Sequence, residues 1–100
     1  MNLQLIFRPE AKFEFFEAII WYENQIPGLG KEFAQEVTQA LERAQTQPEI
    51  FRKVRGRAQR IRLKRFKPYS LYFAVKDDVF SVISVFHGAR NPMELRQRLK

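Results

Sequence analysis

The sequence contains no cysteine and a single histidine, His87. Without cysteine the chain has neither disulfide bonds nor thiolate metal ligands, and one histidine alone makes a poor zinc site. We therefore expect no metal and no other cofactor. The absence of cysteine is also consistent with a reducing, cytoplasmic location.

Long hydrophobic runs are absent as well. No stretch approaches the roughly 20 apolar residues that a membrane-spanning helix needs, and the N-terminal residues lack the charged region and cleavage site of a signal peptide. We expect a soluble cytoplasmic protein that does not enter a membrane. The 100 residues should form one domain, residues 1–100, because so short a chain cannot easily divide its core in two.

Acidic residues are missing from one segment. Residues 52–67 contain nine arginines and lysines and no aspartate or glutamate. The whole chain carries 18 basic and 11 acidic residues, so the net charge of +7 is a local property of this segment. Such clustering indicates an anionic partner, either nucleic acid or an acidic protein, although the charge could serve solubility alone. A membrane surface is disfavoured, because it usually takes an amphipathic basic helix.

The hydrophobic pattern predicts an α+β domain with the order β-α-α-β-β-β and a short C-terminal helix. The first helix should begin at Pro9, which suits a first helical turn, and end at Pro27. We expect the two long helices to form a hairpin on one face of a twisted, mainly antiparallel sheet whose other face stays partly open. The predicted ranges are strands 3–7, 59–65, 69–75 and 79–87, helices 9–26, 29–46 and 92–99, and a connection over 48–56.

Aromatic and aliphatic residues surround much of the first predicted helix. Phe16, Ile20 and Trp21 widen its apolar face, so we expect this helix to be deeply packed. Trp21, Tyr22 and Phe33 stand at helical spacing and should belong to the core.

The basic segment alternates charged and apolar side chains around its predicted strand. Arg60, Arg62 and Lys64 should share one face, where they could bind phosphate or stabilise the charge of a phosphorane. The alternative is a solvated strand face that discourages edge pairing. Arg65 interrupts the alternation, and its facing is not defined by the pattern.

Two further candidates lie at the end of the last strand. His87 could move a proton from a ribose 2′-hydroxyl, or could be a structural residue that hydrogen-bonds the following loop. Arg90 could reach the cationic face, or could pair with Asp77 or with a carboxylate on a helix. Glu49 is the acidic residue nearest in sequence to the basic segment, and it is a weak candidate for a catalytic base.

The sequence resembles the RelE/ParE superfamily of toxins from bacterial type II toxin–antitoxin modules over essentially its whole length, and it is closer to the ParE branch. In that branch Trp-Tyr, Pro-Gly-Leu-Gly and His-x-x-Arg-x-Pro elements commonly occur together. The residues that carry the resemblance are Trp21-Tyr22-Glu23, Pro27-Gly28-Leu29-Gly30, Phe33, Pro48, Arg62-Leu63-Lys64-Arg65-Phe66, Pro68-Tyr69 and His87-Gly88-Ala89-Arg90-Asn91-Pro92.

The resemblance implies a growth inhibitor silenced by a cognate antitoxin from an adjacent gene. Such an antitoxin wraps a segment around the toxin, buries apolar surface and counters the positive charge. The assembly could be a toxin–antitoxin hetero-oligomer or include a homo-oligomer of the toxin.

Branches of the superfamily differ in target, and the fold does not decide between them. ParE-like toxins inhibit DNA gyrase, which is the leading hypothesis here and needs no catalytic residues. In that case Arg60, Arg62, Lys64, Arg65 and Arg90 would bind the target. RelE-like toxins cut mRNA on the ribosome, and His87, Arg62 and Arg90 would then be catalytic. A third alternative is a non-toxic, basic RNA-binding domain.

Overall fold

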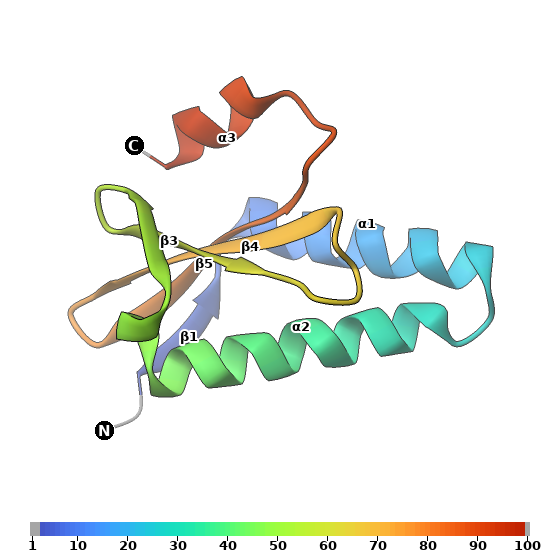
Figure 1. Ribbon diagram of the computed structural model, residues 1–100, viewed down its shortest axis with the longest axis horizontal. Helices are drawn as coiled ribbons and strands as arrows, with labels where there is room; N and C mark the ends of the chain where they lie inside the picture. The colour runs from blue at the N-terminus through green and yellow to red at the C-terminus, as the bar shows by residue number, and fades with distance from the viewer. Residues whose placement is uncertain (1–2, 100) are drawn as a thin grey trace.

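The computed structural model describes residues 3–99, in which helices and a five-stranded sheet form two main layers (Figure 1). In chain order the elements are β1 (Gln4–Phe7), α1 (Pro9–Gln25), α2 (Leu29–Thr46), the 3-10 helix η1 (Pro48–Ile50), β2 (Arg52–Arg55), β3 (Ala58–Arg62), β4 (Tyr69–Lys76), β5 (Val79–His87) and α3 (Pro92–Arg98).

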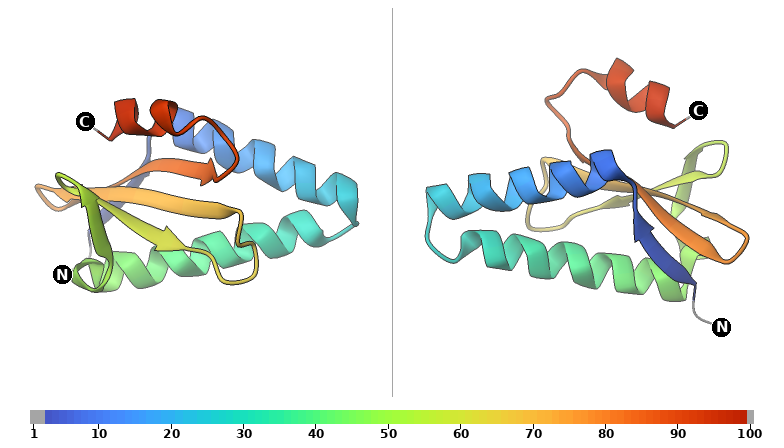
Figure 2. Two further views of the ribbon diagram at one scale, coloured as in Figure 1. Left: turned by 45° about the horizontal axis from the view of Figure 1, so that its top comes forward. Right: turned by 180° about the vertical axis from the view of Figure 1, so that it is seen from behind.

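The strands lie in the order β1-β5-β4-β3-β2. β1 runs parallel to β5, and the other neighbouring pairs are antiparallel. The α1–α2 hairpin covers one face of the sheet, and α3 lies on the opposite side (Figure 2). The predicted α+β architecture, with a helical hairpin on a mainly antiparallel sheet, is confirmed.

The segment predicted as a connection contains a further strand, which corrects the prediction over 48–56. β2 pairs with β3 through a turn at Gly56, whose φ of 54° suits glycine. The side chain of Gln59 donates hydrogen bonds to the carbonyls of Pro48 (2.6 Å) and Phe51 (2.9 Å), which holds the chain entering β2 against β3. β2 is therefore fixed largely by its neighbour.

The strand predicted over 59–65 corresponds to β3, and it ends earlier than expected, at Arg62 instead of Arg65. Beyond it the backbone N–H groups of Lys64 and Arg65 donate to the Glu36 carboxylate of α2, at 3.0 and 3.2 Å. A helix side chain thus satisfies backbone donors that a longer strand would have paired with β4.

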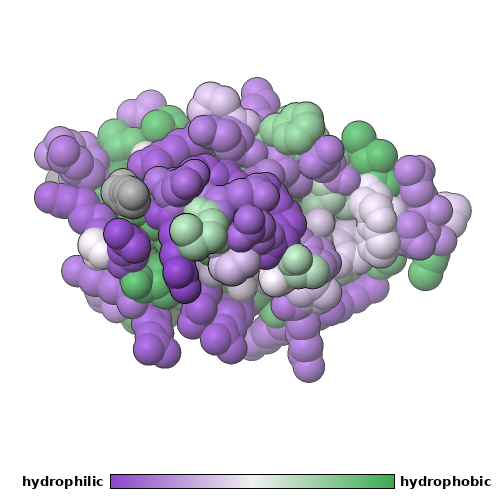
Figure 3. Space-filling model, turned by 90° about the horizontal axis from the view of Figure 1, so that it is seen from above, coloured by the Kyte–Doolittle hydropathy of each residue, from purple (hydrophilic) through white to green (hydrophobic). Residues whose placement is uncertain are grey.

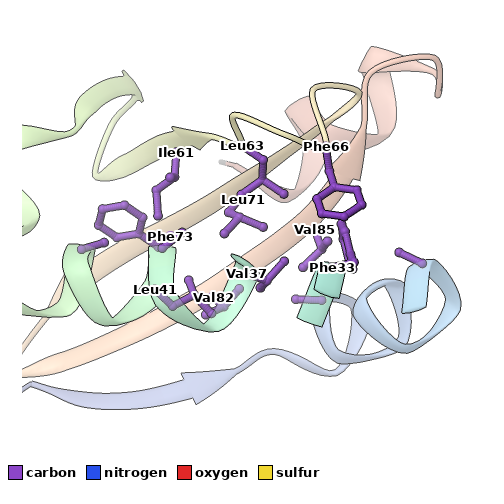
Figure 4. Packing of buried hydrophobic residues seen from close by; sticks show 14 of the residues in the cluster. Phe33, Val37, Leu41, Ile61, Leu63, Phe66, Leu71, Phe73, Val82 and Val85 are labelled. Atoms are coloured by element: carbon purple, nitrogen blue, oxygen red, sulfur yellow. The ribbon is translucent and has the colours of Figure 1, made fainter. Parts of the chain in front are cut away.

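The main hydrophobic core fills the space between the helical hairpin and the sheet. Its labelled residues project towards one another from α2 and from the facing strands and loop (Figure 4). Phe33 is fully buried, and its ring contacts those of Tyr22, Phe66 and Tyr69 at centroid distances of 5.1–5.2 Å. Phe33 is a core residue as predicted, and Tyr22 is half-buried against it.

The turn between the two helices depends on glycine. Gly28 has a φ of 90°, and a Cβ on Gly30 would lie 2.5 Å from the carbonyl oxygen of Ile19 in α1. The Glu23 carboxylate accepts the N–H groups of Gly28 (2.8 Å) and Gly30 (3.1 Å). The Pro-Gly-Leu-Gly sequence therefore allows the two helices to approach closely at this end.

α1 is less deeply packed than the sequence analysis predicted. Ala11 and Ala18 face the core, whereas Phe16, Ile20 and Trp21 are 51%, 59% and 57% exposed. The prediction of a core position for Trp21 is wrong. A hairpin that covers one face of a sheet can bury only one side of each helix, so the second apolar side of α1 is left in solvent.

A smaller cluster occupies the other face of the sheet. Tyr72, Ile83 and Phe86 are buried there, with Leu95 and Leu99 of α3 packed against them. α3 therefore covers part of the face that was expected to stay partly open. The surface seen from the α3 side is mostly hydrophilic, with a few separate hydrophobic groups (Figure 3).

Candidate functional site

We call residues 52–67 the basic hairpin: they comprise β2, β3, the turn between them and most of the loop to β4. β2 is one of the two edge strands of the sheet, at the end opposite β1. Among the residues that the structure describes, Arg65 is the one basic side chain of this segment in an ion pair, with Glu32 of α2. Within residues 3–99 the other eight have no acidic partner.

Three arginines share the open face of the sheet at the basic hairpin. Arg60 and Arg62 of β3 lie opposite Tyr72 and Ser70 of β4, and Arg52 of β2 lies directly opposite Arg60. Arg60 is half-buried, whereas Arg62 and Arg52 are exposed. Like charges directly across a strand pair repel, so this arrangement favours an anion over the three side chains.

The remaining predicted binding residues are placed differently. Lys64 follows β3 in the loop and stays exposed. Arg65 pairs with Glu32, and its guanidinium carbon lies 5.1 Å from the ring centroid of Phe66. The structure thus gathers Arg60 and Arg62 on the sheet face, with Lys64 beside the strand, while Arg65 is partly neutralised.

Arg90 does not join the cations that lack an acidic partner. Its guanidinium binds the carboxylates of Glu14 in α1 and Glu94 in α3, the latter at 2.7 Å, and lies 4.9 Å from the ring centroid of Phe86. Of the pairings expected for Arg90, the one with a helix carboxylate is confirmed.

Glu14 is a functional-site candidate that the sequence analysis missed. Its side chain is only 7% exposed and accepts hydrogen bonds from the Ser84 hydroxyl (2.9 Å), the Val85 N–H (3.0 Å), Arg90 and Arg98. Burial alone would raise the pKa of this carboxyl, but the hydrogen bonds from Arg98, Arg90 and Ser84 outweigh it and hold the pKa below its ordinary value.

The position of Glu14 follows from the shortness of β1. β1 ends at Phe7, opposite Val82, so the rest of β5 has no neighbouring strand on that side. Glu14 accepts the Val85 N–H there, and Arg98 donates to the Ile83 carbonyl at 3.2 Å. The side chains thus pair backbone groups that would otherwise be left unsatisfied at the sheet edge.

His87 ends β5 and is half-buried. Its Nδ1 accepts the N–H of Ala89 at 3.0 Å, and its ring meets that of Tyr69 edge-on at a centroid distance of 5.0 Å. The expected hydrogen bond to the following loop is therefore present. Asn91 caps α3 by accepting the Met93 N–H. This cap, the His87 hydrogen bond and the Arg90 ion pairs together explain the His-x-x-Arg-x-Pro pattern as one that anchors α3.

A groove with a volume of about 850 Å³ lies between α1 and α3. Exposed apolar side chains and carboxylates line it, with the Glu14 ion pairs at one side. Its lining includes Phe13, Ile20, Trp21, Glu10, Glu17, Glu94 and Tyr69. The sequence does contain a signal for this groove. A helix that is apolar on two sides needs a second element to cover it, and so small a domain has no further helix to do so.

None of the helices in residues 3–99 is both long and apolar enough to span a membrane. Within the same range, no three histidine, cysteine, aspartate or glutamate side chains come together as a metal site.

A family model described as the ParE toxin of the type II toxin–antitoxin system, parDE, matches residues 5–92. The chain belongs to the ParE toxin family. A solved structure titled "Chromosomal ParDE TA system from P. aeruginosa" superposes with a TM-score of 0.73 at 16% identity, covering 86% of this chain and 96% of that one. At that identity the likeness concerns the fold. No curated protein sequence matches. As a ParE-family toxin the protein has an antitoxin as its partner.

Proposed function

We propose that this ParE-family toxin arrests growth by binding DNA gyrase through the basic hairpin, without breaking a bond in a substrate. The observation that carries the proposal is the distribution of its guanidinium groups. In the part of the chain that the structure describes, Arg52, Arg60 and Arg62 have no acidic partner on one sheet face, whereas Arg90 is neutralised elsewhere. A surface of unpaired cations suits the recognition of an anionic partner.

The alternative of an mRNA endoribonuclease requires Arg62, Arg90 and His87 to act together on one phosphate. Arg90 is held by Glu14 and Glu94, and Nδ1 of His87 is engaged by the backbone of Ala89. A nuclease would have to release Arg90 from two carboxylates to use its charge. This favours binding over phosphoryl transfer.

The groove between α1 and α3 supports a proposal for the antitoxin. We infer that the antitoxin covers the exposed side chains of Phe13, Phe16, Ile20 and Trp21, which are 51–63% exposed. Phe13, Ile20 and Trp21 line the groove, and Phe16 is exposed on the same helix. Exposed apolar side chains gathered on one element mark protein interaction sites. Two surfaces on different elements therefore serve two partners, the antitoxin on α1 and the target on the basic hairpin.

The test of the proposed target is inhibition of DNA supercoiling by purified gyrase with increasing toxin. We expect inhibition by the wild type and loss of at least about tenfold in potency for Arg60→Ala with Arg62→Ala, since each removes a charged contact. Lys12→Ala with Lys31→Ala removes the same charge from the exposed surface of the helical layer and should retain full potency. Unimpaired gyrase at saturating toxin would overturn the proposal.

Primer extension on abundant mRNAs soon after induction separates the nuclease alternative. We expect growth arrest without new cuts at codon-phased positions, and His87→Gln should arrest growth as fully as the wild type. Cuts that disappear in His87→Gln, with a loss of roughly 10²- to 10⁴-fold, would instead establish general acid–base catalysis. If the folded protein does not arrest growth at all, the alternative of a non-toxic RNA-binding domain is favoured instead.

A further inference from the structure

We propose that the basic hairpin binds the phosphate backbone of duplex DNA directly and without sequence preference. The inference rests on the proposed function only for the place where the contact occurs. Gyrase holds a DNA duplex, and a toxin bound to gyrase could contact that duplex. The binding itself is a property of this chain and can be measured in the absence of gyrase.

The first argument is the absence of internal neutralisation. In the described part of the chain, eight of the nine basic side chains of the hairpin have no acidic partner, whereas Arg90 and Arg98 outside it share the Glu14 carboxylate. The other basic residues outside the hairpin within residues 3–99 also form no ion pair, but they are scattered along the chain: Arg8, Lys12, Lys31, Arg43, Lys76 and Arg96. The hairpin differs from them in gathering its unpaired charges in one segment. Phosphates are the ligands that a row of unpaired arginines and lysines suits best.

The second argument is the spacing of these charges. Arg52 stands directly across from Arg60, and Arg60 and Arg62 are two positions apart on β3. Alternate residues on a strand lie roughly 6.6–6.8 Å apart and paired strands about 4.8 Å apart. The three guanidinium groups therefore form a two-dimensional array rather than a point. An array engages several phosphates of a backbone at once, which a single anion would not require.

The third argument concerns the edge of the sheet. β2 is an edge strand, and Arg55 and Arg57 flank the turn at Gly56 at its end. All three views show this turn at one end of the sheet, clear of the α1–α2 hairpin (Figures 1 and 2). A two-stranded ribbon is narrow enough to approach the major groove of B-DNA, so both backbones of a duplex are within reach of the tip.

The hairpin lacks the groups that would favour other nucleic acids. Single strands bind through exposed aromatic rings on which bases stack, but Phe66 is 5% exposed and Phe51 is half-buried in the core. The one amide of the segment, Gln59, is used for the carbonyls of Pro48 and Phe51, so it is not available to read a base. With base stacking and base recognition excluded, contacts to the phosphate backbone of a duplex are the mode of binding that the hairpin supports.

The test uses the full chain, freed from its antitoxin, and a fluorescent duplex of about 20 base pairs of random sequence, with binding followed by anisotropy between about 50 and 200 mM salt. We expect log K to fall with log salt with a slope of about −3 to −5, since each phosphate contact contributes about −0.9. A second duplex of different sequence should give the same affinity.

Two variants locate the contact. Arg52→Ala with Arg60→Ala, and separately Arg55→Ala with Arg57→Ala, should each make the slope shallower by about 2. The tip variant alters exposed side chains beyond the core, so it keeps the test decisive if the first variant folds poorly. Lys12→Ala with Lys31→Ala should leave the slope unchanged. Circular dichroism melting confirms that each variant is folded.

A slope near zero, or an equal change in the Lys12 and Lys31 control, would overturn the inference. Tighter binding of a single strand of thymidines or of an RNA duplex of the same length would also overturn it. A toxin that coats the DNA substrate would also inhibit supercoiling, so binding of the toxin to gyrase in the absence of DNA separates the two proposals. Binding to gyrase but not to the duplex would overturn this inference alone, and binding to the duplex but not to gyrase would overturn the proposed function alone. The two proposals therefore fail separately.

Discussion

Glu14 shows how a single side chain can complete a sheet. Burying a carboxylate is costly unless it is paired and hydrogen-bonded. Here one carboxylate has two arginines, a hydroxyl and a backbone N–H around it, and both arginines come from the segment after β5. The single carboxylate of Glu14 therefore connects α1 to β5 and α3.

Glu14→Gln should lower the free energy of unfolding by about 2–3 kcal/mol, because Arg90 and Arg98 lose their counter-charge in a partly buried site. The pKa of Glu14 is depressed in the folded protein, so its contribution is present above the unfolded-state value and is lost as pH falls below about 4.5. Wild-type stability should thus drop on acidification, and the variant's should drop less. Urea unfolding as a function of pH measures both.

Glu17→Gln provides the matched control, because Glu17 lies one turn along α1 but is exposed. It should change stability by no more than about 0.5 kcal/mol. Equal stability of Glu14→Gln and the wild type at neutral pH, or identical acid limbs for both, would remove the structural role assigned to this carboxylate.

The role of Glu14 could not be predicted from the sequence. Its periodic position on α1 was visible, but Ser84 and Arg98 lie 70 and 84 residues away along the chain. Arg90 was recognised as a residue that either binds the target or pairs with a carboxylate, and only the fold decides which. Local patterns give a residue's neighbours on its own element and no others.

α1 raises a different problem, at the scale of an element. Ala11 and Ala18 on one side of α1 are buried in the core, but its second apolar side has no cover within residues 3–99. Periodicity alone does not tell a helix buried on two sides from one that awaits a partner. The number of layers in the fold decides between the two cases. A helical hairpin on one face of a sheet has no third helix to cover the second apolar side of α1.

Trp21→Ser with Ile20→Ser should weaken antitoxin binding at least about 30-fold, as expected when about 2 kcal/mol of a central aromatic contact is lost. The free toxin should also self-associate less, and its stability should stay within about 1 kcal/mol of the wild type because both side chains are exposed. Isothermal titration calorimetry with the antitoxin and light scattering of the free toxin measure the two effects.

Ile50→Ser is the corresponding control, because Ile50 is 59% exposed in η1, away from the groove. It should leave antitoxin affinity unchanged. Full affinity in the Trp21 and Ile20 double variant would show that the antitoxin docks elsewhere.

The strands differed in how readily the sequence revealed them. β4 and β5 were predicted within one residue, since their apolar residues run almost without interruption. β2 was missed because Val54 is its one half-buried apolar residue among three exposed cations. Its pairing comes from β3 and from Gln59, which are tertiary effects. The end of β3 was likewise set by Glu36 on α2.

At the scale of the molecule, one aromatic cluster joins the helical hairpin to the sheet. Phe33 of α2 contacts rings from α1, from β4 and from the loop before β4. Phe33→Ala should cost about 3–5 kcal/mol, a large share of the 5–15 kcal/mol typical of a domain. Urea unfolding followed by circular dichroism should show one cooperative transition at a much lower midpoint.

Lys31→Ala, on the exposed side of the same helix, should leave that midpoint within the range of about 0.5 kcal/mol expected of surface substitutions. Two separate transitions in the wild type, or an unchanged midpoint for Phe33→Ala, would contradict a single core shared by both layers.

The pairing of β1 with β5 also sets an order of events during synthesis. Gln4 pairs with Val79 and Phe7 with Val82, so β1, the first strand to be synthesised, can pair only after β5, the last strand, has been made. Contacts so distant along a chain form late. Until then the α1–α2 hairpin has no completed sheet to pack on, and the Glu14 carboxylate has neither arginine. A nascent toxin therefore spends most of its translation without its finished form, which gives an antitoxin already present in the cell time to meet it.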